Sequence, residues 1–140
     1  MSVDLFVNFN GNCREAVSFY AEVFGKDMPE FMTFGDAPQD PEYPLDDQTK
    51  GLVMYTALSI HGTNIMFSDI PPEMPFIAGN NISIAIVSKD TEETKTLFHK
   101  MKEGATIIMD LQETFWSKCY GYLTDKFGIS WQFSLSSEEK

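Results

Sequence analysis

Alternating apolar and polar residues recur along most of the chain and predict a protein rich in β-strands. Residues 128–135 show the pattern most clearly, with Ile129, Trp131, Phe133 and Leu135 alternating with Ser130, Gln132 and Ser134. Because successive side chains of a strand point to opposite faces, the apolar set is expected to enter a core. The polar set is then left to face either water or a binding cleft.

The same patterns predict the order of the elements. Strands are expected at residues 5–9, 29–34, 52–60, 64–69, 81–87, 106–111, 118–124 and 129–135. Apolar residues at helical spacing predict two helices, over 13–24 and 92–103, that Gly25 and Gly104 terminate. Asn12 is the expected N-cap of the first helix, and Asp90 or Thr91 of the second. Residues 36–49, rich in Asp and Pro, are predicted to form a surface loop, and residues 70–80 a connector.

The order strand, helix and three strands occurs twice, with an offset of about 78 residues. Phe19 to Gly25 is echoed by Phe98 to Gly104. We therefore predict a single α+β domain over residues 1–140, with one βαβββ module at about 4–69 and a second at about 80–135. Such modules can build one curved mixed sheet around a cleft, with the helices on the convex side.

The strand faces opposite the helices carry the candidate binding residues. Alternation directs these side chains into the predicted cleft: Asn8, Met66, Ser68, Asn81, Ser83, Ser130 and Gln132. Amides and hydroxyls suit hydrogen bonding to a neutral or zwitterionic small molecule, and a Met there would form an adaptable wall. The alternative is an internal polar network whose members satisfy one another and ordered water.

The segment "QETFWS" at 112–117 places two aromatic side chains in a loop after a polar start. Phe115 and Trp116 could stack on a flat ligand that Gln112 or Glu113 orients. Alternatively, Trp116 closes the core at the end of a sheet or is buried at a dimer interface.

The composition of the chain restricts the classes of molecule that it is expected to bind. The chain carries 21 acidic and 10 basic residues, a net charge of −11, and such a field repels nucleic acid and anionic membranes. No apolar run is long enough to cross a bilayer, and the N-terminal residues lack a signal-peptide pattern. Two cysteines without a CxxC motif fit free thiols in the cytoplasm, although a disulfide between Cys13 and Cys119 stays open. A structural role is expected for both.

Five stretches together resemble the PhnB-like branch of the vicinal oxygen chelate superfamily, which contains glyoxalases, bleomycin-resistance proteins and dioxygenases. They are "FNGNCREAVSFYAEVFG" (9–25), "IMFSD" (65–69), "GNNISIAI" (79–86), "LQETFWS" (111–117) and "DKFGISWQF" (125–133). Members of that branch sometimes carry a demethylubiquinone methyltransferase label. No Gly-rich cofactor loop opens a helix in this sequence. The resemblance also implies a homodimer.

In metal-using members, four strands each supply one ligand, usually His, Glu or Gln. Carried over, these positions fall on Asp4 or Leu5, on Met66, on Asn81 and on Gln132. Alternation favours Asp4 over Leu5. A thioether and neutral amides are poor ligands for hard divalent ions, so we predict no metal and no cofactor. His61 and His99 are expected on the surface, without partners at ligand spacing.

The sequence therefore predicts metal-independent binding of a small molecule in the sheet cleft, with catalytic residues unknown. The first alternative is a metal-dependent lyase, isomerase or dioxygenase, which the superfamily resemblance implies. The second is a metal-free enzyme that uses Glu113 or a cysteine.

Overall fold

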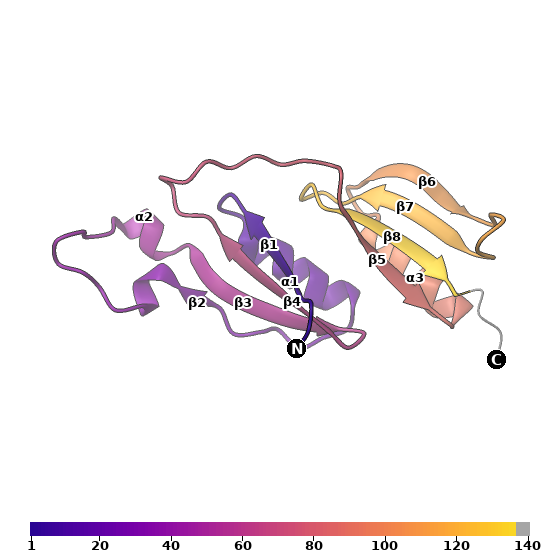
Figure 1. Ribbon diagram of the computed structural model, residues 1–140, viewed down its shortest axis with the longest axis horizontal. Helices are drawn as coiled ribbons and strands as arrows, with labels where there is room; N and C mark the ends of the chain where they lie inside the picture. The colour runs from indigo at the N-terminus through magenta and orange to yellow at the C-terminus, as the bar shows by residue number, and fades with distance from the viewer. Residues whose placement is uncertain (137–140) are drawn as a thin grey trace. The chain divides into compact units, whose positions relative to one another are not determined.

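A computed structural model describes residues 1–136, and the chain divides into two compact units, Met1–Ile77 and Ala78–Lys140. Each unit pairs one four-stranded sheet with one long helix (Figure 1). The boundary lies inside the connector that the sequence predicts at 70–80. The α+β class and the tandem repeat are thereby confirmed. In each module the four strands pair with one another in one sheet.

The first unit contains four strands and its helices in the following order: β1 (Leu5–Phe9), α1 (Cys13–Val23), β2 (Met32–Thr33), the 3-10 helix η1 (Phe34–Asp36), α2 (Asp47–Lys50), β3 (Val53–Ile60) and β4 (Thr63–Asp69). The strand order in the sheet is β1-β4-β3-β2. β1 runs parallel to β4, with Leu5 opposite Ile65, and the other pairs are antiparallel.

The second unit repeats this topology. Its elements are β5 (Ser83–Ser88), α3 (Thr91–Met101), β6 (Thr106–Gln112), β7 (Tyr120–Thr124) and β8 (Ser130–Leu135). The strand order is β5-β8-β7-β6, and β5 runs parallel to β8 with Ser83 opposite Ser130. The first and last strands of each module are therefore neighbours in space.

Aromatic side chains fill the core of each unit between its sheet and its long helix. In the first unit, Phe9, Tyr20 and Phe67 are buried, with the Tyr20 and Phe67 ring centroids 5.8 Å apart. In the second, Phe98 from α3 meets Phe133 edge-on at 5.9 Å. Burying a large side chain of this kind stabilises the fold by roughly 1.5–3 kcal/mol.

Two local predictions are wrong in the first unit. The strand expected at 29–34 contains only Met32 and Thr33, because the Thr33 N–H donates to Asp36 Oδ2 at 3.0 Å and the chain turns into η1. The loop expected at 36–49 ends in the short helix α2. Its N-cap is Asp46, whose side chain accepts a hydrogen bond from the Thr49 N–H at 2.7 Å.

A buried aspartate anchors a strand end in the first unit. Asp69, the last residue of β4, accepts hydrogen bonds from the N–H groups of Gly11, Cys13 and Val53, each at 2.9 Å. These contacts tie the start of α1 and the start of β3 to the end of β4. The Asp69 carboxylate is buried, and the three backbone donors take the place of water around it.

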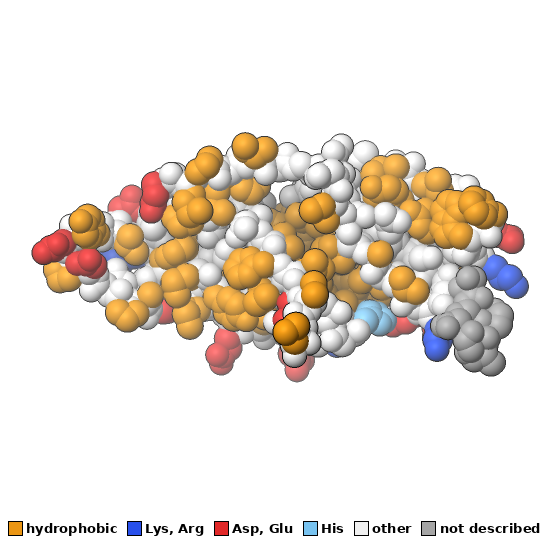
Figure 2. Space-filling view, viewed as in Figure 1, with side chains coloured by type: hydrophobic (Ala, Val, Ile, Leu, Met, Phe, Trp, Pro, Cys, Tyr) orange, Lys and Arg blue, Asp and Glu red, His pale blue; other side chains and the backbone are white. Residues whose placement is uncertain are grey.

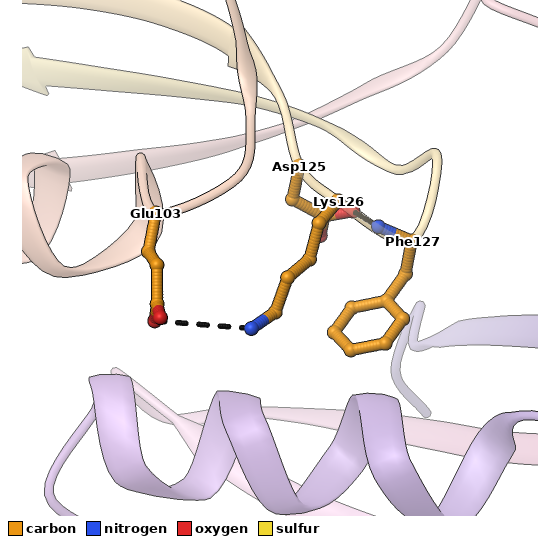
Figure 3. A network of polar contacts seen from close by, with 4 residues as sticks. All are labelled: Glu103, Asp125, Lys126 and Phe127. Carbon is orange, nitrogen blue, oxygen red and sulfur yellow. Dashed lines mark hydrogen bonds and ion pairs between the residues drawn. The ribbon is translucent and has the colours of Figure 1, made fainter.

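The second unit has a comparable anchor in the turn between β7 and β8. Asp125 Oδ1 accepts hydrogen bonds from the N–H groups of Phe127 at 2.8 Å and Ile129 at 3.0 Å. Figure 3 shows the Phe127 contact beside an ion pair between Lys126 and Glu103, 3.8 Å apart. The Glu103 side chain is largely exposed, so the turn depends on Asp125 more than on this ion pair.

The described surface is acidic in places and apolar in others. In Figure 2, acidic side chains lie at the tip of the segment between η1 and α2, and hydrophobic side chains gather over β6 and the loop that follows it. Among residues 1–136, no helix has the length and apolar character that a membrane crossing requires.

Candidate functional site

The strand face of the second unit that points away from α3 carries a chain of hydrogen-bonded polar side chains. Tyr120 Oη donates to Gln132 Oε1 at 2.5 Å, and Gln132 Nε2 donates to Ser83 Oγ at 2.8 Å. These residues come from β7, β8 and β5, whose pairing places the three side chains diagonally across one face. The sequence identified Ser83 and Gln132 but missed Tyr120. The available signal was the alternation of β7, which places Tyr120 and Tyr122 on the same face as Gln132.

Tyr120 keeps its proton in this network. Burial raises the pKa of the Tyr120 phenol above its ordinary value, and the neighbouring Tyr122 adds to the increase. At neutral pH the phenol is therefore a hydrogen-bond donor and carries no charge.

Ser130, two residues before Gln132 in β8, has its hydroxyl directed toward β7. Its Oγ lies 3.0 Å from Thr124 Oγ1, and the residue is buried. Because its hydroxyl already has a partner and little access to solvent, Ser130 contributes to the sheet more than to an open binding surface.

The loop after β6 presents its two aromatic side chains beside this network. Phe115 is 97% exposed and Trp116 is 45% exposed. The Trp116 ring lies 5.3 Å from the Tyr120 ring in an edge-to-face arrangement and 4.8 Å from the Phe115 ring. Trp116 is therefore not a core residue of the described chain, and the alternative that it closes the core at the end of a sheet is wrong.

Hydrogen bonds at the base of the loop hold this arrangement. The Thr114 N–H donates to the Ser117 carbonyl at 2.8 Å, and the Ser117 N–H donates to Thr114 Oγ1 at 3.1 Å. Ser117 Oγ also donates to the Leu135 carbonyl at 2.8 Å, which fixes the loop to β8. Gln112 and Glu113 are both exposed, and Gln112 Nε2 donates to the Asp110 carbonyl at 3.2 Å.

The equivalent face of the first unit brings together Asn8 and Ser68. Ser68 Oγ donates to Asn8 Oδ1 at 2.9 Å, across the parallel pair β1 and β4. Met66 lies on the same face, opposite Phe6, and is partly buried. Asn81, by contrast, is exposed and precedes β5, so the strand position predicted for it is wrong.

The donor set at the four carried-over metal positions does not fit a divalent ion. Asp4 is exposed, precedes β1 and accepts a hydrogen bond from Ser2 Oγ at 3.3 Å. Gln132 offers only a neutral amide oxygen, which already accepts from Tyr120, and Met66 offers only a thioether. Within residues 1–136, no three His, Cys, Asp or Glu side chains lie close enough together to hold a metal ion.

Both cysteines are buried free thiols, so they form no disulfide with each other. Burial, together with the nearby Asp69 carboxylate, raises the pKa of Cys13 to about 12. Burial likewise raises the pKa of Cys119, which lies in the bend before β7 and outside the strand. A thiol that stays protonated is a weak nucleophile, so these environments favour structural roles.

Two βαβββ units with parallel first and last strands define the fold class of glyoxalases, bleomycin-resistance proteins and dioxygenases. A domain described as glyoxylase/bleomycin resistance protein/dioxygenase, from Frankia sp. EAN1pec, shares the fold with a TM-score of 0.66 at 11% identity, over 97% of each chain. Within this class the assignment is more specific. The model of the family described as 3-demethylubiquinone-9 3-methyltransferase matches residues 2–134, and the chain belongs to that family.

Individual relatives are similar to this chain over nearly its whole length. Protein YjdN from Escherichia coli (strain K12) is 26% identical over 99% of this chain and 98% of its own length. The crystal structure of protein PA1353 from Pseudomonas aeruginosa gives a TM-score of 0.82 at 31% identity, over 96% of this chain and 98% of that one. A Bacillus cereus structure, described as a putative 3-demethylubiquinone-9 3-methyltransferase and PhnB protein, gives 0.74 at 29% identity, over 97% and 100%. The PhnB-like resemblance is thereby confirmed.

Proposed function

We propose that this protein binds a small, flat organic molecule on the sheet face of its second unit, without a metal ion. One observation carries the proposal: the Trp116 ring lies directly beside the hydrogen-bonded chain of Tyr120, Gln132 and Ser83. An exposed aromatic wall next to a few oriented polar groups is the usual composition of a small-molecule site.

The side chains of the polar chain hydrogen-bond to one another and still have donors and acceptors left for a ligand. The Gln132 amide uses one of its two N–H donors for Ser83, and its carbonyl oxygen has a second lone pair. The Ser83 hydroxyl accepts from Gln132 and keeps its own hydrogen to donate. A neutral ligand with one donor and one acceptor could therefore join the chain without breaking it.

The first unit offers an equivalent polar pair in Asn8 and Ser68, beside Met66. The sequence predicts that both faces line one shared cleft, and that statement stays a prediction. In the proposal, Asn8, Met66 and Ser68 are the candidate ligand contacts of the first unit. Gln112 and Glu113, at the end of β6, are its proposed polar rim.

Metal-dependent lyase, isomerase or dioxygenase chemistry is the less favoured candidate, because the positions that would hold the ion carry two amides, a thioether and a single exposed carboxylate. The methyltransferase description of the family also lacks support from a cofactor loop. The N–H groups of Gly11 and Cys13, at the start of α1, are bound by the Asp69 carboxylate, which leaves no anion-binding loop there.

The test is a ligand screen on chelator-treated protein, with thermal unfolding and tryptophan fluorescence as readouts. A panel of flat aromatic amides and acids should contain compounds that raise the unfolding temperature saturably. Trp116→Ala and Gln132→Leu should each weaken such a ligand by about tenfold or more. Gln48→Leu, on the exposed surface of α2, is the matched control. Ligands that bind Trp116→Ala and Gln132→Leu as tightly as the parent would contradict the proposal.

We also infer that the protein is a cytoplasmic homodimer. The inference is supported by exposed apolar side chains on β6 and its loop, Ile107, Ile108 and Phe115, and by two thiols that remain reduced. Sedimentation analysis should give twice the chain mass, and Ile108→Asp should shift the equilibrium toward monomer. A monomer at all concentrations would contradict the dimer.

A further inference from the structure

A pocket in the first unit has no role in the function proposed above. It has a volume of about 420 Å³ and is lined by Glu30, Phe31, Met32, Asp36 and Tyr55. We propose that this pocket binds a small organic ammonium ion with a flat apolar body. The volume is within the range of small-molecule sites.

Short irregular elements build the pocket. Met32 in β2 pairs with Tyr55 in β3, and the register shifts immediately after it, between Met32 and Thr33. Thr56 Oγ1 donates to the Glu30 carbonyl at 2.8 Å, which ties the segment before β2 to β3. The segment that lines the pocket is therefore held to the sheet at two points.

The charged groups that line the pocket are both acidic. Asp36 is the third residue of η1, and its carboxylate accepts a hydrogen bond from the Thr33 N–H at 3.0 Å. Hydrogen bonds from the backbone and side chain of Thr33 hold the pKa of Asp36 below its ordinary value. Asp36 therefore stays ionised at neutral pH, with its position fixed before any ligand arrives. Glu30 is exposed and adds a second carboxylate.

The aromatic walls suit a cation as well. The Arg14 guanidinium carbon lies 4.7 Å from the centroid of the Phe31 ring. That face of the Phe31 ring is therefore already covered by the chain's own cation, so the ammonium group of a ligand would use the carboxylates and the ring of Tyr55. Tyr55 supplies a second aromatic wall and Met32 a polarisable thioether.

These features select an organic cation over other ligands. The two carboxylates outweigh the single positive charge of the neighbouring Arg14, and the net charge of −11 raises the local concentration of cations. A bare divalent ion would need more ligands than Glu30 and Asp36 provide, and it would leave the aromatic walls unused. An ammonium group with an apolar body uses the carboxylates and the rings together.

The proposed site is independent of the one in the second unit. Apart from Tyr55, which lies in β3, its lining residues belong to the segment 30–36. None of them was identified from the sequence as a binding residue. The ammonium site can therefore be disproved while the function proposed above holds, and the function proposed above can be disproved while the ammonium site holds.

The experiment is an NMR titration of the full chain with 2-phenylethylammonium chloride, followed through backbone amide shifts. The matched uncharged probe is 2-phenylethanol. The ammonium probe should shift residues 30–36 and 55, and bind about tenfold more tightly than the alcohol. Glu30→Gln should remove most of that difference, whereas Glu42→Gln, an exposed carboxylate outside the pocket, should not. Both substitutions are on the surface, so folding is preserved.

Equal binding of the two probes, or an equal loss in Glu30→Gln and Glu42→Gln, would overturn the proposal. So would an absence of saturation up to about 10 mM probe, since that affinity is too weak for a built site. Trp116→Ala separates the two sites and should leave ammonium binding unchanged. Loss of binding in that variant would place the probe in the second unit and also overturn this inference.

Discussion

Trp131 donates its indole Nε1–H to Oδ2 of Asp125 at 2.8 Å, deep in the second unit. The opposite oxygen of the same carboxylate accepts the two backbone N–H groups of the following turn. One side chain therefore connects the largest residue of the core to the hairpin that positions β8. Since β8 carries Gln132, the candidate site depends on this connection.

Asp125→Ala is expected to destabilise the protein by about 2–4 kcal/mol, because it leaves three buried or partly buried donors without their acceptor. Urea unfolding measures the change. Asp110→Ala is the control, since Asp110 is exposed on β6 and its carboxylate accepts a hydrogen bond from the adjacent Leu111 N–H. It should stay within about 0.5 kcal/mol of the parent. Equal effects of the two substitutions would contradict this role of Asp125.

Gly121→Ala is expected to destabilise the protein by about 1–3 kcal/mol through overpacking. A Cβ at this position in β7 would lie 2.6 Å from Cε1 of Phe98, whose ring is held in the core by α3. Thermal unfolding provides the measurement. Gly51→Ala is the control, since its Cβ would come no closer than 3.6 Å to another atom. A stability of Gly121→Ala equal to that of the parent would show that Phe98 can move aside.

The Cys13 thiol makes stability fall at alkaline pH. Burial raises its pKa from 9.0 to about 12, so the folded state binds the proton more tightly than the unfolded state. The contribution is fully present below pH 9 and is lost as the pH rises from 9 toward 12. The slope should reach about 1.4 kcal/mol per pH unit for this group. Unfolding free energies measured between pH 8 and pH 10.5 should therefore decline less steeply in Cys13→Ala, and parallel curves would contradict the assignment.

Metal titration is expected to show no stoichiometric site. Protein purified without tags or chelators should contain far less than one metal ion per chain by mass spectrometry. Ni²⁺, Zn²⁺, Mn²⁺ and Fe²⁺ should give no saturable binding, because the four candidate positions lack imidazole and present one exposed carboxylate. One bound ion per chain, lost in Gln132→Ala, would reverse this expectation and restore the metal-dependent chemistries.

Periodicity predicted most of the fold, because the long elements bury one face each. α3 and β8 follow their patterns closely, and the repeat of the module was visible in the spacing of Phe19 and Phe98. α2 was missed because its four residues are too few to show apolar side chains repeating at helical spacing. Its one signal was Asp46 three residues before Thr49, the spacing of an N-cap contact.

The candidate site was predicted only in part, because its contacts are made between distant segments. Gln132 and Ser83 were assigned to one face by alternation alone. The burial of Asp69 was not predictable, since its donors Gly11 and Cys13 lie far away in the chain. The pocket around Glu30 and Tyr55 was missed because its segment was interpreted as a regular strand.

The parallel pairing of the first and last strands in each module affects how the chain folds during synthesis. β1 is made early, but its partner β4 is completed only at Asp69, so its edge remains unpaired while the intervening elements emerge. The same delay recurs for β5 and β8. A chain interrupted in the connector would leave every described strand pair of the first sheet intact. A chain interrupted one strand earlier would lose the central strand β4, and with it the attachment of β1.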